Sequence, residues 1–253
     1  QIYEHLAGDN SRVLPSEFLN STPPGRGSGE FTLDSDNVIT QKFGRPFGTH
    51  ARLFTVGSYK EASIGLDCHH SAQSVAENML SHMKLANDDL LLLDAVAGND
   101  IFGNTLYLQD MLVFVVKPER EGVDVFMRFY ELAQKAGMGE RVFAIGNQVA
   151  TKRQEQFLLD TITKEHLLGM LPMSEELIDA RLDNEPVSLA LLGERERDVF
   201  ASVSKKANEL HRAPDYYYDA IVELHKKIAA EGWVAGAYRS GMDDQIDPSY
   251  EVK

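Results

Sequence analysis

Leu90-Leu91-Leu92-Leu93-Asp94-Ala95-Val96-Ala97-Gly98 is the stretch that decides the fold class of this chain. Four consecutive leucines lead into a carboxylate, and small residues with a glycine follow it. Continuous apolar runs are typical of parallel strands that are covered on both faces. Sheets of this kind bind ligands at the carboxyl ends of their strands. The stretch therefore predicts a buried strand that ends at a candidate site residue, Asp94.

Asp94 and Gly98 have two interpretations. In a nucleotide hydrolase, an acid at this place holds the shell of a magnesium ion or orients water, and the glycine lets the backbone approach the terminal phosphate. The alternative is an ordinary strand that ends in an aspartate before a turn. The run itself does not separate the two.

Further strands alternate with helices downstream of this run. Apolar runs occupy residues 111–116, 141–147 and 167–172. Apolar residues recur at helical spacing over 123–133, a polar helical stretch covers 151–163, and Ser174 begins another helix. This alternation predicts an α/β fold, a doubly wound and mostly parallel sheet flanked by helices, like that of P-loop NTPases.

The order of these motifs resembles that of one known family. The motifs are Asp94-x-x-Ala97-Gly98, Val116-Lys117-Pro118-Glu119-Arg120, Ile145-Gly146-Asn147-Gln148-Val149 and Gly169-Met170-Leu171-Pro172. They resemble those of the CooC-like ATPases, which mature nickel-containing carbon monoxide dehydrogenase and belong to the class of MinD, ParA and the nitrogenase iron protein. The resemblance spans roughly residues 1–200, and residues 52–57 sit where that family has its next sheet strand.

The resemblance implies a role for each matching residue. Asp94 corresponds to the Walker B acid and Gly98 to the switch II glycine beside the γ-phosphate. Asn147 meets the adenine base, and the backbone around Pro172 closes the base pocket. An amide offers both a donor and an acceptor to a purine edge, although an asparagine after Gly146 also suits an ordinary turn. The implied cofactors are ATP and Mg²⁺, and the implied assembly is a nucleotide-driven homodimer that acts on a client metalloenzyme.

The phosphate-binding motif of this class does not occur in the sequence. No G-x-x-x-x-G-K-[ST] is present, and the glycine-rich residues 23–30 are followed by neither Lys-Ser nor Lys-Thr. We expect residues 23–30 to form a flexible surface segment without a phosphate. Two explanations stay open: the native protein carries a strand, loop and helix before Gln1, which we favour, or it is a degenerate relative that serves as a binding or scaffold subunit.

Cys68 is the only cysteine of the chain, which excludes an internal disulfide and fits a reducing cytoplasm. The resembled family carries a Cys-x-Cys pair here, through which two subunits share a metal ion, and His70 replaces the second cysteine. Cys68 and His70 from two subunits would give four ligands for zinc or nickel. The alternative is a buried free cysteine in a loop that enters a helix capped by Ser71.

Composition restricts the partners. A net charge of -14 argues against non-specific nucleic-acid binding, and no apolar run is long enough for a membrane span. We expect a cytoplasmic protein with an α/β domain over residues 1–212 and a helical extension over 213–253. Within the extension, residues 215–231 predict a helix with an apolar stripe that includes Ile221 and His225, and residues 243–253 predict an acidic tail.

Overall fold

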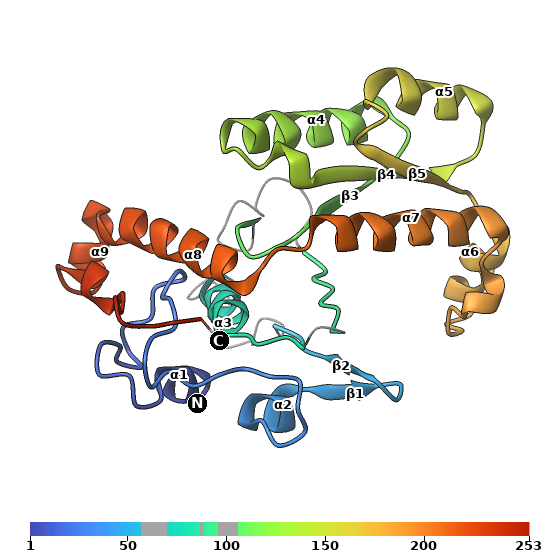
Figure 1. Cartoon of the computed structure of the whole chain (residues 1–253). Helices are drawn as coiled ribbons and strands as arrows, with labels where there is room; N and C mark the ends of the chain where they lie inside the picture. The colour runs from blue at the N-terminus through green and yellow to red at the C-terminus, as the bar shows by residue number, and fades with distance from the viewer. Residues whose placement is uncertain (57–69, 87–88, 96–105, 253) are drawn as a thin grey trace. The chain divides into compact units, whose positions relative to one another are not determined.

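A computed structural model of the chain describes residues 1–56, 70–86, 89–95 and 106–252, and the chain divides into two compact units. We call residues 96–101 and 109–212 the sheet unit, and residues 1–95, 102–108 and 213–253 the helical unit. Figure 1 labels the elements of both. No helix in the described ranges is long and apolar enough to cross a membrane. The division of the chain at residue 212 that the sequence suggested stays a prediction.

The sheet unit is built on three parallel strands. They are β3 (Leu112–Val116), β4 (Val142–Val149) and β5 (Leu167–Pro172), and they lie in this order. The helices that alternate with them are α4 (Arg120–Lys135), α5 (Lys152–Thr161), α6 (Glu175–Leu182) and α7 (Glu194–Leu210), with short 3-10 turns η4 (Gly139–Arg141) and η5 (Leu189–Leu191). The predicted α/β fold with a parallel sheet flanked by helices is confirmed.

Helices cover both faces of this sheet. Gly146 of β4 pairs with Met170 of β5, whereas Gly169 pairs with Ile145. A Cβ at Gly146 would lie 2.5 Å from Leu158 of α5, and a Cβ at Gly169 would lie 2.6 Å from Val199 of α7. Because successive residues of a strand point to opposite faces, α5 and α7 pack on opposite faces. A Cβ at either position would force the facing side chain to shift, so glycine lets α5 and α7 pack close to these two strand positions.

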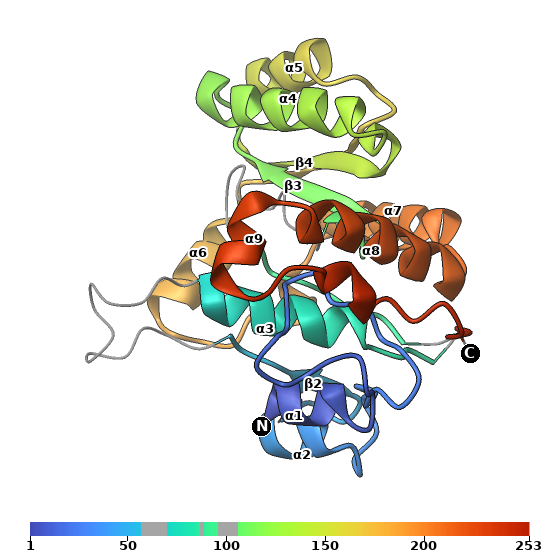
Figure 2. The same ribbon diagram turned by 90° about the vertical axis from the view of Figure 1, so that its left-hand side faces the viewer.

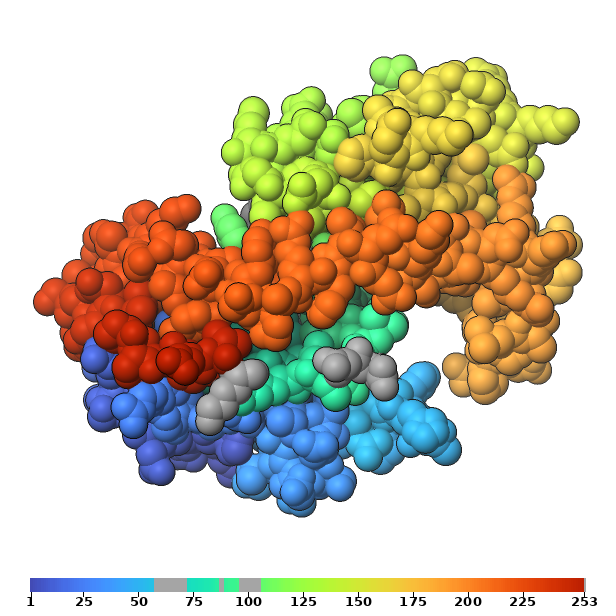
Figure 3. Space-filling model, in the orientation of Figure 1, coloured from blue at the N-terminus to red at the C-terminus, as the bar shows by residue number. Residues whose placement is uncertain are grey.

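Aromatic side chains attach α4 to the face that α5 covers. The ring of Phe114 in β3 lies 5.7 Å from that of Phe126 and 4.7 Å from that of Phe129. Phe114 pairs with Ala144, two residues before Gly146, so both residues point to the same face. Figures 1 and 2 show α4 and α5 together on this face. The outer side of α7 is exposed and is seen as orange atoms in Figure 3.

The helical unit packs short elements around two apolar clusters. Its helices are α1 (Ile2–Ala7), α2 (Val38–Phe43), α3 (His70–Ser81), α8 (Pro214–Ala229), α9 (Gly232–Ala237) and the 3-10 turn η6 (Met242–Gln245). One cluster consists of Leu6, Ala7, Val13, Phe18, Phe31 and Ile39, and the other of Leu19, Val234 and Met242. Strands β1 (Arg45–Phe47) and β2 (Ala51–Leu53) form an antiparallel pair.

The C-terminal residues join this unit through buried polar contacts. The predicted apolar stripe of α8 is confirmed, since Ile221 and His225 are fully buried. The two ring nitrogens of His225 contact the Ser21 hydroxyl at 3.2 Å and the Met242 carbonyl at 3.0 Å. The prediction of an acidic tail is wrong for Asp247, which is buried and whose carboxylate accepts hydrogen bonds from the backbone of Arg26 and from Ser249.

Two strand predictions are corrected. Residues 89–95 have no regular secondary structure, and Leu90, Leu91, Leu92 and Leu93 are 70, 41, 82 and 42% exposed. A strand needs a hydrogen-bonded neighbour, and in the described part of the chain none pairs with this run. The strand expected over 52–57 is β2, which pairs antiparallel with β1 instead of extending the parallel sheet. The turn at residues 48–50 brings these two short strands together.

Candidate functional site

The sheet unit contains a cavity of about 410 Å³ at the carboxyl ends of β4 and β5. The last residues of the two strands, Val149 and Pro172, line it together with Ala150 and Met173. The polar residues around it are Thr151, Lys152, Glu155, Glu175 and Arg195. Open α/β sheets bind their ligands at the carboxyl ends of the strands. The cavity therefore lies where a sheet of this kind places its ligand.

A β-bulge distorts β4 immediately before the cavity. Gly146 pairs with Met170 and Val149 pairs with Pro172, so β4 uses one more residue than β5 over this interval. Gln148 has a φ of 59°, in the left-handed region that side chains other than glycine rarely adopt. Bulges and residues of this kind concentrate at functional sites, where they redirect a side chain. Here the residue next to the distortion is Asn147.

Asn147 retains hydrogen-bonding capacity for a ligand. Its side chain is half-buried, and its Oδ1 accepts a hydrogen bond of 3.0 Å from the backbone N–H of Gln148. Its Nδ2 has no partner among the residues that the structure describes, and Oδ1 keeps a second lone pair. The side chain can thus donate to and accept from one flat ligand edge.

A capping box holds the loop beside the cavity. The Thr151 hydroxyl accepts a hydrogen bond of 3.2 Å from the backbone N–H of Gln154. The Gln154 side chain accepts hydrogen bonds from the backbone N–H groups of Thr151 at 3.1 Å and Ala150 at 2.9 Å. These reciprocal bonds satisfy free donors at the start of α5 and fix the path of the chain that lines the cavity.

An ion pair joins α5 to α7 at the cavity. Nη2 of Arg195 lies 2.6 Å from Oε1 of Glu155. Both side chains are partly exposed, so the pair stabilises the fold by no more than about 1 kcal/mol. Its main effect is to orient two side chains at the cavity. Because the charges of Lys152 and Arg195 balance those of Glu155 and Glu175, the lining has no net formal charge.

The structure places one of the six predicted site residues, Pro172, in the lining of this cavity, and Asn147 is not part of that lining. Pro172 lines the cavity and pairs with Val149, two residues after Asn147. Asp94 lies in the exposed segment 89–95 of the helical unit. Gly98 and Cys68 lie outside the described residues, and His70 is the first residue of α3, with a side chain that is not described. Within the described ranges, no three His, Cys, Asp or Glu side chains are grouped to hold a metal ion.

Among the residues of this cavity that sequence reasoning missed are Thr151, Glu155 and Arg195. Thr151 has a signal that could have identified its role as a cap, because Thr-x-x-Gln is a capping-box pattern. Glu155 and Arg195 are forty residues apart in the chain and belong to different helices. No local sequence pattern predicts such an ion pair between two helices.

Comparison with known proteins identifies one distant relative. No family model matches the chain. An uncharacterized ATP-binding protein of Methanocaldococcus jannaschii is 28% identical to it over 180 residues, which cover 68% of this chain and 67% of the relative.

Proposed function

We propose that this chain is an ATP-binding protein and that the cavity of the sheet unit receives the adenine base. The observation that carries the proposal is the position of Asn147 in the bulge of β4: it lies two residues before Val149, which lines the cavity with Pro172, and its Nδ2 has no partner among the described residues. The name of the relative from Methanocaldococcus jannaschii, an ATP-binding protein, supports the same ligand.

The cavity suits a neutral heterocycle better than a triphosphate. Val149 and Pro172 offer apolar surface to the faces of a flat ring. The amide of Asn147 can donate to a ring nitrogen of adenine and accept from its amino group. The Arg195 guanidinium is paired with Glu155, so a carboxylate already engages the arginine that lines this cavity.

The finer proposal is a CooC-like ATPase. Asp94 is exposed and has no partner among the described residues, so its carboxylate is available to the water shell of Mg²⁺. Gly98 would approach the terminal phosphate, and the nucleotide-driven homodimer would act on a client metalloenzyme. Cys68 and His70 would bind zinc or nickel between two subunits. This part of the proposal rests on the resemblance of the motifs.

Nucleotide titrations of the purified protein test the proposal. The fluorescence of a labelled ATP should report saturable binding, and unlabelled ATP and adenosine should compete, since adenosine carries the base that the cavity receives. Asn147→Ala removes hydrogen bonds to that base and should weaken binding of both competitors by about tenfold, or about 1.4 kcal/mol. Asn208→Ala, at an exposed position of α7 away from the cavity, is the matched control.

Three results are informative. Absence of saturable binding by the wild-type protein would refute the ATP-binding proposal. Equal affinity of the wild type and Asn147→Ala would refute the placement of the base. Binding of ATP without its hydrolysis would favour a non-catalytic binding or scaffold subunit over the ATPase.

A further inference from the structure

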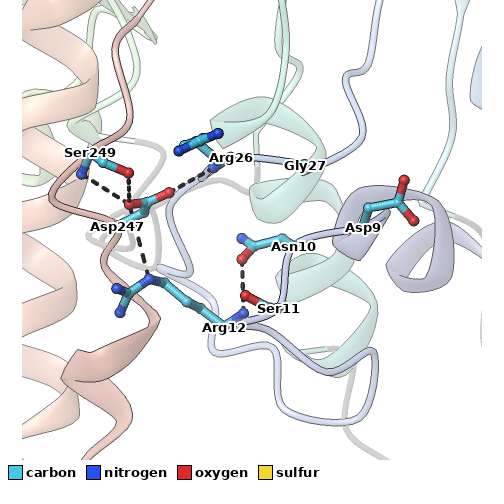
Figure 4. Close-up of a pocket in the computed structure, with 8 residues that line it drawn as sticks. All are labelled: Asp9, Asn10, Ser11, Arg12, Arg26, Gly27, Asp247 and Ser249. Carbon is cyan, nitrogen blue, oxygen red and sulfur yellow. Dashed lines mark hydrogen bonds and ion pairs between the residues drawn. The ribbon is translucent and has the colours of Figure 1, made fainter.

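The helical unit contains a cavity of its own, with a volume of about 400 Å³ (Figure 4). Three separate segments line it: residues 9–12 after α1, the turn at residues 26–27, and the C-terminal residues Asp247 and Ser249. Every lining residue except Gly27 has a polar side chain. This cavity is independent of the proposed base site, whose lining residues all belong to the sheet unit.

Asp247 forms the centre of this cavity. Its Oδ2 accepts a hydrogen bond of 2.9 Å from the backbone N–H of Arg26. Its Oδ1 accepts from the backbone N–H and the hydroxyl of Ser249, at 2.9 and 2.7 Å. These bonds, with that of Arg26 the largest contribution, lower the pKa of Asp247 to about 2. The carboxylate is ionised, and backbone and hydroxyl donors already occupy it.

Arg12 and Arg26 flank this carboxylate without forming hydrogen bonds to it through their guanidinium groups. In Figure 4 they lie on either side of Asp247, while the Asp9 side chain points away from them. Nε of Arg12 is 4.0 Å from Oδ1 of Asp247, and its Nη1 donates to the Asp244 carbonyl at 2.9 Å. The Arg26 guanidinium has no partner among the described residues. Most donors of the two groups are therefore available.

The loops that carry the arginines are held in place, so the expectation of a flexible segment over residues 23–30 is wrong for Arg26 and Gly27. Asn10 is buried, its Oδ1 accepts a hydrogen bond of 2.9 Å from the backbone N–H of Arg12, and its Nδ2 donates to the Ser28 hydroxyl at 3.0 Å. Gly27 has a φ of 83°, and a Cβ there would lie 2.7 Å from the carbonyl carbon of Asp9. The two loops thus approach through backbone contacts. A ligand bound to the arginines would meet a lining that is already ordered.

We propose that this cavity binds a phosphate-bearing small molecule through the guanidinium groups of Arg12 and Arg26. A guanidinium group presents a planar fork of donors that matches phosphate oxygens. A phosphate has enough oxygens to accept from two such forks at once, and the cavity has room for more than the phosphate itself. Asp247 contributes by fixing the backbone of Arg26 while leaving its side chain free.

Calorimetric titration with pyrophosphate tests the proposal on the full chain. Saturable binding should weaken by about tenfold in the double variant Arg12→Gln/Arg26→Gln, because two charge-assisted contacts are removed. It should also weaken as the salt concentration rises. Arg45→Gln removes one positive charge from an exposed position on β1 of the same unit and should bind like the wild type.

The variants and a second ligand make the outcome unambiguous. Arg26→Gln removes no side-chain contact with the described residues and should leave the fold intact. Arg12→Gln loses the bond to the Asp244 carbonyl and the ion pair with Asp247, so the fluorescence of Trp233 is used to verify folding. Absence of saturable pyrophosphate binding, or equal binding by the double variant, would overturn the proposal. If ADP competes and its competition is lost in the double variant, the site receives a nucleotide phosphate. If ADP does not compete, it receives free phosphates.

Discussion

Acidification should destabilise the helical unit through His82, which directly follows α3. The side chain is 4% exposed, and its Nδ1 lies 2.9 Å from the carbonyl oxygen of Asn78. The ring also faces Phe18, with 5.9 Å between the centroids. Burial lowers the pKa of His82 from 6.5 to about 4, although the bond to Asn78 acts in the opposite direction. The folded protein therefore holds a neutral imidazole at neutral pH.

The sign and size of the effect follow from these two pKa values. Between pH 6.5 and pH 4 the unfolded chain binds a proton that the folded protein does not, so the free energy of unfolding falls as the pH falls. One pKa unit corresponds to about 1.4 kcal/mol. Through His82, acidification from pH 7 to pH 4 should therefore lower the free energy of unfolding by about 3 kcal/mol.

His82→Asn isolates this contribution, because an asparagine amide can place an N–H donor where Nδ1 lies and does not titrate. Trp233, the single tryptophan, belongs to α9 of the helical unit, so its fluorescence during urea unfolding reports on this unit. Other groups titrate in both proteins and cancel in the difference. The stability of the wild type relative to the variant should fall by about 3 kcal/mol between pH 7 and pH 4. A difference that does not change with pH would refute the reasoning.

Three further predictions concern α3, the sheet and the cap of α5. Burial raises the pKa of Glu77 to about 7, so the stability that its protonated form gives is lost as the pH rises to 8. In the same urea assay, Glu77→Gln should have a free energy of unfolding about 1 kcal/mol higher than that of the wild type at pH 8 and an equal one at pH 4. Gly169→Ala should lower the free energy of unfolding of the sheet unit by about 1–3 kcal/mol, measured by circular dichroism in urea. The loss should be smaller in a Val199→Ala background, because the Val199 side chain occupies the space that the new Cβ would take. Thr151→Ala should lower the free energy of unfolding by about 1 kcal/mol in the same measurement, because the backbone N–H of Gln154 loses the hydroxyl that accepts its hydrogen bond. An unchanged stability would contradict the role of the capping box.

The sheet unit was predictable because its signals are local. The apolar run at residues 167–172 is β5 from its first residue to its last, and Ser174 caps α6 as its sequence context indicates. Apolar runs, caps and helical periodicity each act over a few residues. They suffice where each strand lies beside its neighbour in sequence order, as β3, β4 and β5 do.

The same reasoning failed at Leu90–Leu93 because an apolar run specifies burial only if another element covers it. Four leucines predict a strand from composition, yet strand formation depends on a paired neighbour elsewhere in the chain. In the candidate site, too, local motifs identify some residues and tertiary contacts determine others. Pro172, which a motif at a strand end singled out, lines the cavity, and the roles of Asn147 and Pro172 stay predictions, whereas the pairing of Glu155 with Arg195 depends on tertiary structure.

The C-terminal residues show why total charge does not determine what a local site can bind. A net charge of -14 suggests a poor partner for anions. However, charges farther apart than about 8–10 Å are largely screened at physiological salt, so the groups that line a cavity dominate its affinity. Around Asp247, backbone donors from Arg26 and Ser249 occupy the carboxylate and leave two guanidinium groups to face the cavity. Arg26, whose backbone N–H donates to the Asp247 carboxylate, is 221 residues away from Asp247 in the sequence. An acidic chain can therefore contain an anion site whose existence only its folded structure reveals.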